Sequence, residues 1–245
     1  MLSSEHLQTA LATQAPGARA PAAEGGIEIV VDRLDLGAES VRAATALLSD
    51  PERQRAARFA LHGDRRRFIV ARARLRRLLG ERLDVPPDAI ELSYGARGKP
   101  ALAPHSAAAD LRFNLAHCDE VAVYAFSYGR EVGVDVEAVR LLEDADDMAA
   151  RFFSAREKTA YLALDPRDRP LGFFNCWTRK EAFIKALGDG LYYPLDRFDV
   201  SLAPGEPARL LRVEGTPGDR CGWFLDGFAP APGHVAAIAG ERARH

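Results

Sequence analysis

Hydrophobic and polar positions along this chain follow two different periods, one typical of strands and one typical of helices. Residues 27–35, IEIVVDRLD, form a short run rich in β-branched residues, which predicts a strand. Residues 65–80 then place apolar side chains at helical spacing, and Gly80 is expected to end that helix. The apolar stripe of this helix consists of Phe68, Ala71, Leu75, Leu78 and Leu79.

A capping box predicts a shorter helix between that strand and the long helix. Ser49 is followed three residues later by Glu52, so each side chain can bond the backbone N–H group of the other residue. The second half of the chain repeats the order. EVGVDVEAV resembles a strand, Ser154 and Glu157 form another capping box, and GFFNCWTRKEAFIKALG predicts a long helix that ends at Gly188.

The repeated order predicts the fold class. Further strand-like runs are LRFNLA and VAVYAFSY in the first half, and DRFDVSL, RCGWFLDGF and HVAAIAG in the second. We expect an α+β chain of two similar halves, residues 27–130 and 131–240, packed about a pseudo-two-fold axis, although helices and strands can also alternate without duplication. Residues 1–26, rich in Ala, Gly and Pro, are expected to form a flexible leader. Ligand clefts favour interfaces between such units, so a site is expected at the junction.

Composition and charge narrow the setting. The 245 residues are 47% hydrophobic, enough for a sizeable core, and the net charge of −2 gives no general attraction to nucleic acid or membranes. We find no signal peptide at the N-terminus and no apolar run approaching the roughly 18 residues of a membrane span. The three cysteines, Cys118, Cys176 and Cys221, are far apart and predict neither a zinc site nor a disulfide framework. Free thiols fit a reducing compartment, so the expected location is the cytoplasm.

Two carboxylates share one face of the strand-like run GVDVE. Asp135 and Glu137 are two residues apart and should project together, while Val134 and Val136 lie on the opposite face. Adjacent carboxylates repel each other unless a cation lies between them. Their hard oxygen atoms suit Mg²⁺, which usually takes one or two carboxylates together with substrate phosphates. A polar strand face at the protein surface would explain the same pattern without a metal.

A third carboxylate lies in the long helix of the second half. Only four of the 33 basic residues are lysines, and two of them, Lys180 and Lys185, flank Glu181. Glu181 and Lys185 are four residues apart, a spacing that favours an ordinary helix ion pair. Lys180 is turned about 100° away from Glu181, and Trp177 lies on the same side as Glu181. Three apolar residues of this helix are expected to face the core: Ala182, Phe183 and Ala186.

Cationic groups occur in several other segments. YGARGKP places Arg97 and Lys99 in a Gly-Pro turn, which can present cations and backbone N–H groups to a phosphate. His117 follows the strand-like FNLA, where a lone histidine is usually structural. Ten arginines crowd residues 53–77, and a charged helix surface explains most of them, because a phosphate site requires only two or three. A metal site surrounded by cations suits a polyphosphate substrate.

The motifs RGKP, FNLAH, GVDVE, RFFSAREK and WTRKEAFIK occur in the order found in the Sfp-type 4′-phosphopantetheinyl transferases, and the chain resembles this family over roughly residues 49–191. The resemblance implies a monomeric pseudo-dimer of two α+β halves. It also implies transfer of the phosphopantetheine arm of coenzyme A to a serine of an apo acyl, peptidyl or polyketide carrier protein, with release of 3′,5′-ADP and with Mg²⁺ as cofactor. Neither nucleic acid nor a membrane is an expected partner.

The resemblance also implies roles for individual residues. Asp135, Glu137 and Glu181 would hold Mg²⁺ on the diphosphate, with Val136 or water completing its shell. Glu181 would take the serine proton, directly or through water. Lys185 would stabilise or protonate the leaving phosphate, since an ammonium group can release a proton whereas a guanidinium hardly can. The residues expected to contact the coenzyme are Arg53, Arg55, Arg76, Lys99, Pro100, Ala116, His117, Asp135 and Lys185.

Two positions depart from the family pattern, and two other functions stay open. Ala116 replaces the usual serine, a loss of about 0.5–1.5 kcal/mol if one hydrogen bond is missing. Cys118 is expected to be a small neighbour of the coenzyme and not a nucleophile. A Mg²⁺-dependent hydrolase of coenzyme A or nucleotides would release free phosphopantetheine without an acceptor. A non-catalytic module would only bind coenzyme A or a carrier, but pure binding does not require Lys185.

Overall fold

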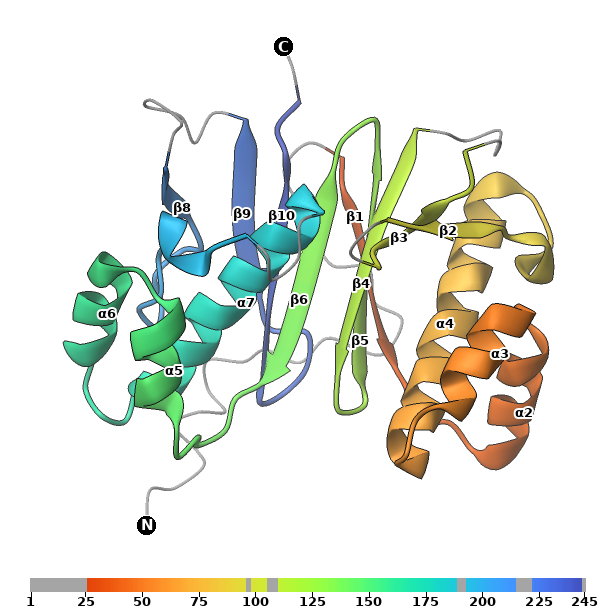
Figure 1. Cartoon of the computed structure of the whole chain (residues 1–245), viewed down its shortest axis with the longest axis horizontal. Coiled ribbons are helices and arrows are strands. Elements are labelled where there is room, and N and C mark those ends of the chain that lie inside the picture. Colours follow the sequence, from red (N-terminus) through yellow and green to blue (C-terminus); the bar gives the residue numbers. More distant parts are fainter. Residues whose placement is uncertain (1–25, 96–97, 105–109, 189–192, 215–221, 244–245) are drawn as a thin grey trace.

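The structure is a computed structural model of the whole chain, and it describes residues 26–95, 98–104, 110–188, 193–214 and 222–243. Two α+β halves lie side by side, with helices at the two outer ends and strands between them (Figure 1). Of the expected leader, only Gly26 is among the described residues. No helix in the described ranges is long and apolar enough to cross a bilayer.

The N-terminal half contains a three-stranded antiparallel sheet in the order β1-β5-β4. Three helices, a short 3-10 helix (η1) and a small hairpin separate β1 from the other two strands of this sheet. In chain order the elements are β1 (Glu28–Arg33), α2 (Ala38–Ala46), α3 (Asp50–Ala57), α4 (His62–Leu83), η1 (Pro87–Ala89), β2 (Leu92–Tyr94), β3 (Pro100–Leu102), β4 (Leu111–Cys118) and β5 (Val121–Tyr128).

The C-terminal half repeats this plan with the sheet order β6-β10-β9. Its elements are β6 (Val132–Ala138), α5 (Ala145–Phe152), α6 (Ala155–Leu162), α7 (Arg169–Leu187), η3 (Leu195–Arg197), β7 (Phe198–Val200), β8 (Leu210–Val213), β9 (Trp223–Phe228) and β10 (His234–Glu241). In each half the first strand pairs with the last, which pairs with the one before it. The predicted duplication is therefore confirmed. β5 ends at Tyr128 and β6 begins at Val132, and the division between residues 130 and 131 stays our prediction.

The ends of the two long helices follow different rules. α7 ends as predicted, with Gly188 in the left-handed conformation (φ 82°) as its cap. α4 continues past Gly80 to Leu83, and Asp84 (φ 53°) caps it instead. The expected end at Gly80 is therefore wrong. A Cβ atom on Gly80 would lie 2.7 Å from the carbonyl oxygen of Val85, so this glycine lets the following loop fold back onto the helix.

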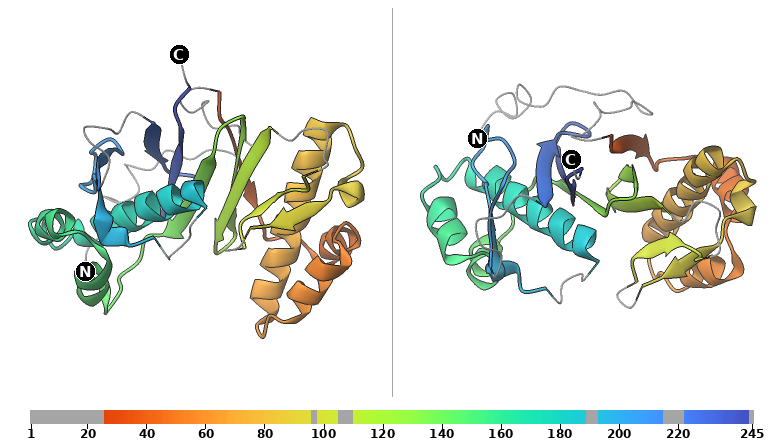
Figure 2. Two further views of the ribbon diagram at one scale, coloured as in Figure 1. Left: turned by 45° about the horizontal axis from the view of Figure 1, so that its top comes forward. Right: turned by 90° about the horizontal axis from the view of Figure 1, so that it is seen from above.

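Apolar clusters lie between the two sheets and on the outer face of each sheet. Seen from above, the two three-stranded sheets lie in the middle of the molecule between the helices of the two halves (Figure 2). One core lies between the two sheets, with Ile29 and Val31 of β1 packed in the same cluster as Val134 and Val136 of β6. α4 covers the other face of the first sheet and α7 the other face of the second. The three residues of α7 predicted to face the core are at most 1% exposed: Ala182, Phe183 and Ala186.

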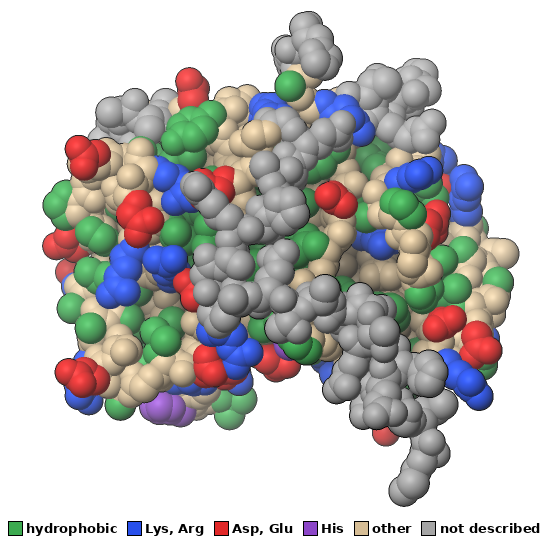
Figure 3. Space-filling model, turned by 180° about the vertical axis from the view of Figure 1, so that it is seen from behind, with side chains coloured by type: hydrophobic (Ala, Val, Ile, Leu, Met, Phe, Trp, Pro, Cys, Tyr) green, Lys and Arg blue, Asp and Glu red, His purple; other side chains and the backbone are tan. Residues whose placement is uncertain are grey.

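Charges of both signs are interspersed among the described side chains on the face seen from behind (Figure 3). This distribution agrees with the small net charge of −2. A mixed surface of this kind produces no extended field of one sign, so it gives no general attraction to a polyanion.

α7 approaches β6 so closely that their backbones touch. A Cβ atom on Gly133 would lie 2.2 Å from the carbonyl oxygen of Ala182 and 2.3 Å from the backbone nitrogen of Ala186. Asp135 follows Gly133 on the same face of the strand. Any larger residue at position 133 would push the helix, and the side chains beside Ala182 and Ala186, away from Asp135.

We expect Gly133→Ala to lower the free energy of unfolding by about 3 kcal/mol, because the new methyl group would meet backbone atoms that cannot rotate away. Urea denaturation of the purified protein measures this change. Gly222→Ala is the matched control, since no neighbouring atom in the described part of the chain lies within 4 Å of the place that its methyl group would take. Equal stability of the two variants would contradict the close packing of α7 on β6.

Candidate functional site

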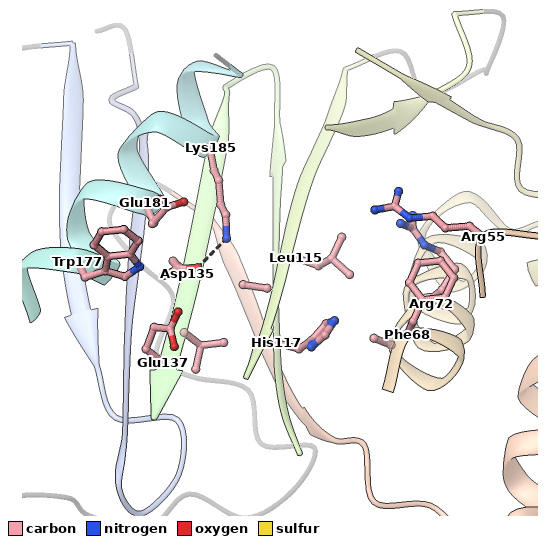
Figure 4. Close-up of a pocket in the computed structure, with 13 residues that line it drawn as sticks. Arg55, Phe68, Arg72, Leu115, His117, Asp135, Glu137, Trp177, Glu181 and Lys185 are labelled. Atoms are coloured by element: carbon pink, nitrogen blue, oxygen red, sulfur yellow. Dashed lines mark hydrogen bonds and ion pairs between the residues drawn. The ribbon is translucent and has the colours of Figure 1, made fainter. Parts of the chain in front are cut away.

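A cavity of about 480 Å³ lies between the two halves. One wall comes from α3, α4 and β4, and the opposite wall from β6 and α7 (Figure 4). The cavity is therefore at the junction, where the sequence predicted a site. The residues that line it are Arg55, Phe68, Ala71, Arg72, Leu115, Ala116, His117, Asp135, Val136, Glu137, Trp177, Glu181 and Lys185.

The structure brings the three predicted carboxylates together on one wall. Asp135 and Glu137 project from the same face of β6, and Glu181 comes from the adjacent face of α7 (Figure 4). Asp135 is buried, whereas Glu137 and Glu181 are half-buried. The strand pattern therefore predicted the orientation of the first two side chains, and the contact between α7 and β6 adds the third.

Lys185 does not form the helix ion pair that its spacing favoured. Its Nζ atom donates a hydrogen bond to Asp135 Oδ1 at 2.6 Å, because α7 lies directly against β6. Two acceptors of this wall are buried without a hydrogen-bond partner in the described part of the chain, Asp135 Oδ2 and Glu181 Oε1. The wall thus has more acceptor atoms than its own lysine satisfies.

Burial raises the pKa of all three carboxyl groups. The pKa of Glu181 rises to about 7, first through burial and then through the charges of Asp135 and Glu137, against the opposing effect of Lys185. Burial likewise raises the pKa values of Asp135 and Glu137. Burial alone would lower the pKa of Lys185, but the Asp135 carboxylate outweighs it and produces a net rise. The lysine is therefore firmly charged beside carboxyl groups that a further cation would stabilise.

The donor atoms of this wall suit Mg²⁺, although they do not form a closed cage. Among the described residues, no group of three His, Cys, Asp or Glu side chains is gathered closely enough to hold a metal ion. Mg²⁺ usually binds through one or two carboxylates and completes its shell with water and substrate phosphates. The unpartnered oxygens of Asp135 and Glu181 fit that requirement. The wall is suited to a metal ion whose remaining ligands come from a phosphate group.

Arg72 lies on the opposite wall and was not singled out by the sequence analysis. It is 5% exposed, and its guanidinium lies 5.7 Å from the ring centre of Phe68 and 5.9 Å from that of Tyr94. Its Nε and Nη1 atoms have no hydrogen-bond partner within the described ranges. Glu52 Oε1 lies 3.6 Å from Nε. A buried cation with free donors is costly until an anion binds to it.

The sequence contained a signal for Arg72. Arg72 follows Phe68 by four residues, so it occupies a core-facing position of α4. An arginine on the apolar stripe of a helix requires a partner inside the protein. We did not single out Arg72 because it lies among many arginines, and the sequence alone does not distinguish a buried arginine from an exposed one.

The other arginines expected near the coenzyme lie in different places. Arg55 lines the cavity, with its guanidinium 5.4 Å from the ring centre of Phe68. Arg53 is outside the cavity wall and pairs with Asp50 at 2.6 Å. Arg76 is 1% exposed. The structure corrects the assignment of Arg76 to coenzyme binding, because a side chain sealed inside the N-terminal half cannot meet a phosphate in the cavity.

Lys99 and Pro100 of the RGKP motif also lie outside the cavity wall. Lys99 Nζ donates to Glu131 Oε2 at 2.9 Å and to the carbonyl oxygens of Val132 and Ala186 at 3.2 Å each. This lysine therefore joins β6 to the C-terminal end of α7. Pro100 begins β3, opposite Tyr94, and Arg97 lies outside the described residues. The expected contacts of Lys99 and Pro100 with the coenzyme stay predictions.

Ala116 and His117 line the cavity from β4. His117 lies within the strand, not after it as the sequence pattern indicated. Burial lowers the pKa of His117, and the charge of Lys185 lowers it further. The imidazole is therefore neutral near pH 7, and it can donate one hydrogen bond to a phosphate without adding a positive charge.

Cys118 faces β6 instead of the cavity. Its Sγ atom accepts from the N–H group of Ala138 at 3.4 Å and donates to Glu137 Oε2 at 3.5 Å. Burial raises the pKa of the thiol to about 11. The thiol stays protonated, which agrees with the expectation that it is not a nucleophile. Cys118 is not among the residues that line the cavity, although it lies on the same strand face as Ala116, so its expected place beside the coenzyme stays a prediction. Cys176 is buried and free, and Cys221 lies outside the described ranges.

Trp177 gives the acidic wall an apolar flank. Its ring stacks on Phe173 with centres 6.2 Å apart and meets Phe152 edge-on at 5.7 Å. These contacts hold the indole at the cavity, four residues before Glu181. The apolar surface lowers the local polarity and contributes to the burial of that carboxyl group.

We expect Glu181→Gln to stabilise the metal-free protein at pH 8 by about 2 kcal/mol. A carboxyl group whose pKa is raised on folding contributes its stability below its unfolded pKa, and this contribution is lost as pH rises toward about 7. Above pH 7 the folded wild type holds a poorly solvated charge, which glutamine lacks. Urea denaturation in EDTA at pH 8 and pH 5 measures the difference, which should be several-fold smaller at the lower pH, where the folded carboxyl group is protonated. A glutamine variant no more stable than wild type at pH 8 would contradict the raised pKa.

The sequence matches the family model described as 4′-phosphopantetheinyl transferase, N-terminal, over residues 37–128, and the 4′-phosphopantetheinyl transferase superfamily over residues 131–239. It is 37% identical over 206 residues to the 4′-phosphopantetheinyl transferase HetI of Nostoc sp., which covers 84% of each chain.

Two further matches are more distant. The 4′-phosphopantetheinyl transferase Sfp of Bacillus subtilis is 29% identical over 174 residues, which covers 71% of this chain and 75% of Sfp. The crystal structure of Thermotoga maritima holo-[acyl-carrier-protein] synthase is 23% identical with a TM-score of 0.34, over 46% of this chain and 64% of that chain. This last likeness is too remote to add to the argument. The extent of the match to HetI, together with the two family models, shows that the chain belongs to the 4′-phosphopantetheinyl transferase superfamily.

Proposed function

We propose that this protein transfers the 4′-phosphopantetheine group of coenzyme A to a serine hydroxyl of an apo carrier protein. The products are the holo carrier and 3′,5′-ADP. This proposal rests on one observation: an acidic wall and a basic wall face each other across the same cavity. The unpartnered oxygens of Asp135 and Glu181 line one wall, and the unpartnered nitrogens of Arg72 line the other. A diphosphate with a bound cation can satisfy both walls at once.

The carboxylate wall supports Mg²⁺ as the cofactor. We place Asp135, Glu137 and Glu181 as its protein ligands, because they are hard oxygen donors on adjacent elements. When bound, the ion would neutralise the diphosphate and make its phosphorus more electrophilic.

We assign the role of base to Glu181. In the metal-free site its pKa of about 7 lies near the working pH, and a cation bound beside it would favour the deprotonated form that a general base requires. It takes the proton of the carrier serine, directly or through water, as the serine oxygen forms its bond to phosphorus. The bond between that phosphorus and the bridging oxygen breaks, and the electron pair leaves with 3′,5′-ADP.

Lys185 supports departure of the leaving group. Its ammonium is held at the cavity by Asp135, beside the acidic wall. Negative charge develops on the leaving phosphate as the bond breaks, and a fixed ammonium group stabilises it. The same group can also donate a proton.

The opposite wall binds the coenzyme. We place a phosphate group of coenzyme A against Arg72, with Arg55 and neutral His117 nearby on the same cavity surface. The aromatic rings of Phe68 and Tyr94 hold the Arg72 guanidinium in place, so little side-chain freedom is lost on binding.

We place the enzyme in the cytoplasm as a monomer, acting on acyl, peptidyl or polyketide carriers, with neither nucleic acid nor a membrane as a partner. The monomer is supported by a cavity whose two walls both belong to one chain. The cytoplasmic location is supported by the free thiols of Cys118 and Cys176.

Intact-mass spectrometry of an apo acyl carrier protein, incubated with this protein, coenzyme A and MgCl₂, tests the proposal. The carrier should gain the mass of one phosphopantetheine group, and EDTA should prevent the gain. Free phosphopantetheine without carrier modification would favour the hydrolase instead. Coenzyme A bound but unchanged with acyl, peptidyl and polyketide carriers would favour a binding module.

We expect Glu181→Gln to lower kcat by about 10²–10⁴-fold, because the serine loses its base. Initial rates of carrier modification at saturating coenzyme A and MgCl₂ measure this effect. Glu39→Gln, on the exposed surface of α2, is the control and should retain wild-type kcat. Full activity of the Glu181→Gln variant would refute the assignment of the base.

Arg72→Met should raise KM for coenzyme A by about 10-fold or more, because a charge-assisted hydrogen bond to a phosphate is worth about 1.5–3 kcal/mol. The value of KM for the carrier protein should change little. Arg77→Met is the control, because it removes the same charge from the exposed side of α4, away from the cavity. It should retain the wild-type KM for coenzyme A. A wild-type KM for coenzyme A in the Arg72 variant would remove Arg72 from the binding site.

A further inference from the structure

Each half contains a buried pair of one glutamate and one cation, in the same place of the repeated fold. In the C-terminal half, Glu157 and Lys180 are 2.8 Å apart and at most 1% exposed. In the N-terminal half, Glu52 and Arg76 are 2.7 Å apart and at most 2% exposed. In both pairs the glutamate closes the capping box of the shorter helix and the cation lies on the long helix. The proposed reaction assigns no role to either pair.

Lys180 fastens α7 to the segment that follows it. Its ammonium group donates to the carbonyl oxygens of Leu195 and Phe198 at 2.6 and 2.7 Å, and it forms an ion pair with Glu157 Oε2 at 2.8 Å. Three oxygen atoms therefore surround the buried ammonium group. The ammonium also lies 4.1 Å from the ring centre of Phe198. These contacts fix the side of α7 on which Lys180 lies.

Glu157 is equally well satisfied. Its Oε2 atom accepts from the N–H group of Ser154 at 2.8 Å, and its Oε1 atom accepts from the N–H group of Val200 at 2.7 Å. The pair therefore joins the start of α6, the middle of α7, η3 and β7. Neither residue is among those that line the cavity.

In the corresponding pair of the N-terminal half, one glutamate oxygen lacks a hydrogen-bond partner among the described residues. Arg76 donates to Glu52 Oε2 and to the carbonyl oxygens of Pro87 and Ile90. Glu52 Oε1, however, has no hydrogen-bond partner among the described residues and lies 3.6 Å from Arg72 Nε. Through this atom the N-terminal pair reaches the cavity wall.

Lys180 immediately precedes Glu181 in α7. Adjacent helix residues point about 100° apart, so fixing one side chain inside the fold fixes the direction of the next. Lys185, four residues after Glu181, lies on the same helical face as Glu181. The rotation of α7 about its axis therefore decides whether Glu181 and Lys185 reach Asp135.

We propose that these two buried pairs position the two walls of the site. Glu157 and Lys180 hold α7 in the rotation that directs Glu181 and Lys185 into the cavity. Glu52 and Arg76 hold Arg72 at the place where the coenzyme binds, with Arg76 neutralising most of the charge that would otherwise attract Arg72 inward. All four are positioning residues, and the inference rests on the proposed function, which assigns the base to Glu181 and a phosphate site to Arg72.

The two pairs should have different kinetic effects, although they occupy the same place in the fold. The double variant Glu157→Gln with Lys180→Met removes the tether without leaving a buried charge, and glutamine can still close the capping box. We expect its kcat to fall 10- to 100-fold, because small displacements of reacting groups have effects of this size. Its KM for coenzyme A should stay within 3-fold of wild type.

Arg76→Met should affect binding instead. Glu52 then has Arg72 as its neighbouring cation, so it draws the Arg72 guanidinium away from the cavity while its own charge stays compensated. We expect KM for coenzyme A to rise about 10-fold and kcat to stay within 3-fold of wild type.

Arg179→Met provides the matched control on α7. Arg179 is 6% exposed and donates to the carbonyl oxygens of Ser201 and Glu206, so its hydrogen bonds are separate from those that join Glu157 to Lys180. Its loss should lower thermal stability and leave kcat and KM within 3-fold of wild type. A purely structural role of the pairs would give the same pattern in all three variants.

The experiment compares kcat, KM for coenzyme A and thermal stability of the full-length wild type and the three variants. Wild-type kcat in the double variant, an equal loss of kcat in Arg179→Met, or an unchanged KM in Arg76→Met would overturn the inference. If wild type itself fails to modify any carrier, the proposed function fails, and the inference fails with it. An active wild type with unaltered variants refutes the inference alone.

Discussion

The site depends on the contact between the backbones of α7 and β6. Because Gly133 has no side chain, Ala182 and Ala186 of α7 rest directly on the strand. Glu181 and Lys185 are the neighbours of these alanines along the helix, so the same contact carries them to Asp135. The acidic wall is therefore a result of packing. The burial that comes with this packing also raises the pKa of Glu181 to about 7.

The two halves share their structural framework but differ in the side chains that they present to the cavity. Both halves use the same strand order, the same capped helix and the same kind of buried ion pair. The residue after the buried cation differs, however. It is Glu181 at the cavity in α7, whereas it is Arg77 on the exposed surface of α4. One copy of the unit supplies acidic groups and the other supplies Arg72, so the two walls complement each other.

Local patterns predicted the features that depend on neighbouring residues. The capping boxes at Ser49 and Ser154 and the end of α7 at Gly188 follow from short-range rules, and all three are present. α2 was not anticipated, because its short sequence carries neither a capping box nor a long apolar stripe. The end of α4 was predicted too early, because Gly80 does not cap the helix. Its missing side chain makes room for the loop that follows the helix and packs back against it.

The partners of charged residues were harder to predict than the elements that carry them. Lys185 pairs with Asp135, far away in sequence, and no local spacing contains that information. Among the crowded arginines, Arg72 and Arg76 are both buried, yet one faces the cavity and the other the interior. Sequence motifs thus identified which residue types gather at the site, while tertiary packing decides which atoms meet there.

When two copies of one unit are joined in a single chain, each copy can acquire substitutions that the other does not share. In a symmetric dimer of identical subunits, any substitution appears on both sides of the interface, so an acid introduced into one wall also enters the other. Here the position after the buried cation is Glu181 at the cavity in one helix, whereas its counterpart Arg77 lies on the exposed surface and the opposite wall takes its charge from Arg72. Covalent linkage thus permits a cleft whose two faces carry opposite charge, with a direction in which an elongated, asymmetric ligand can lie.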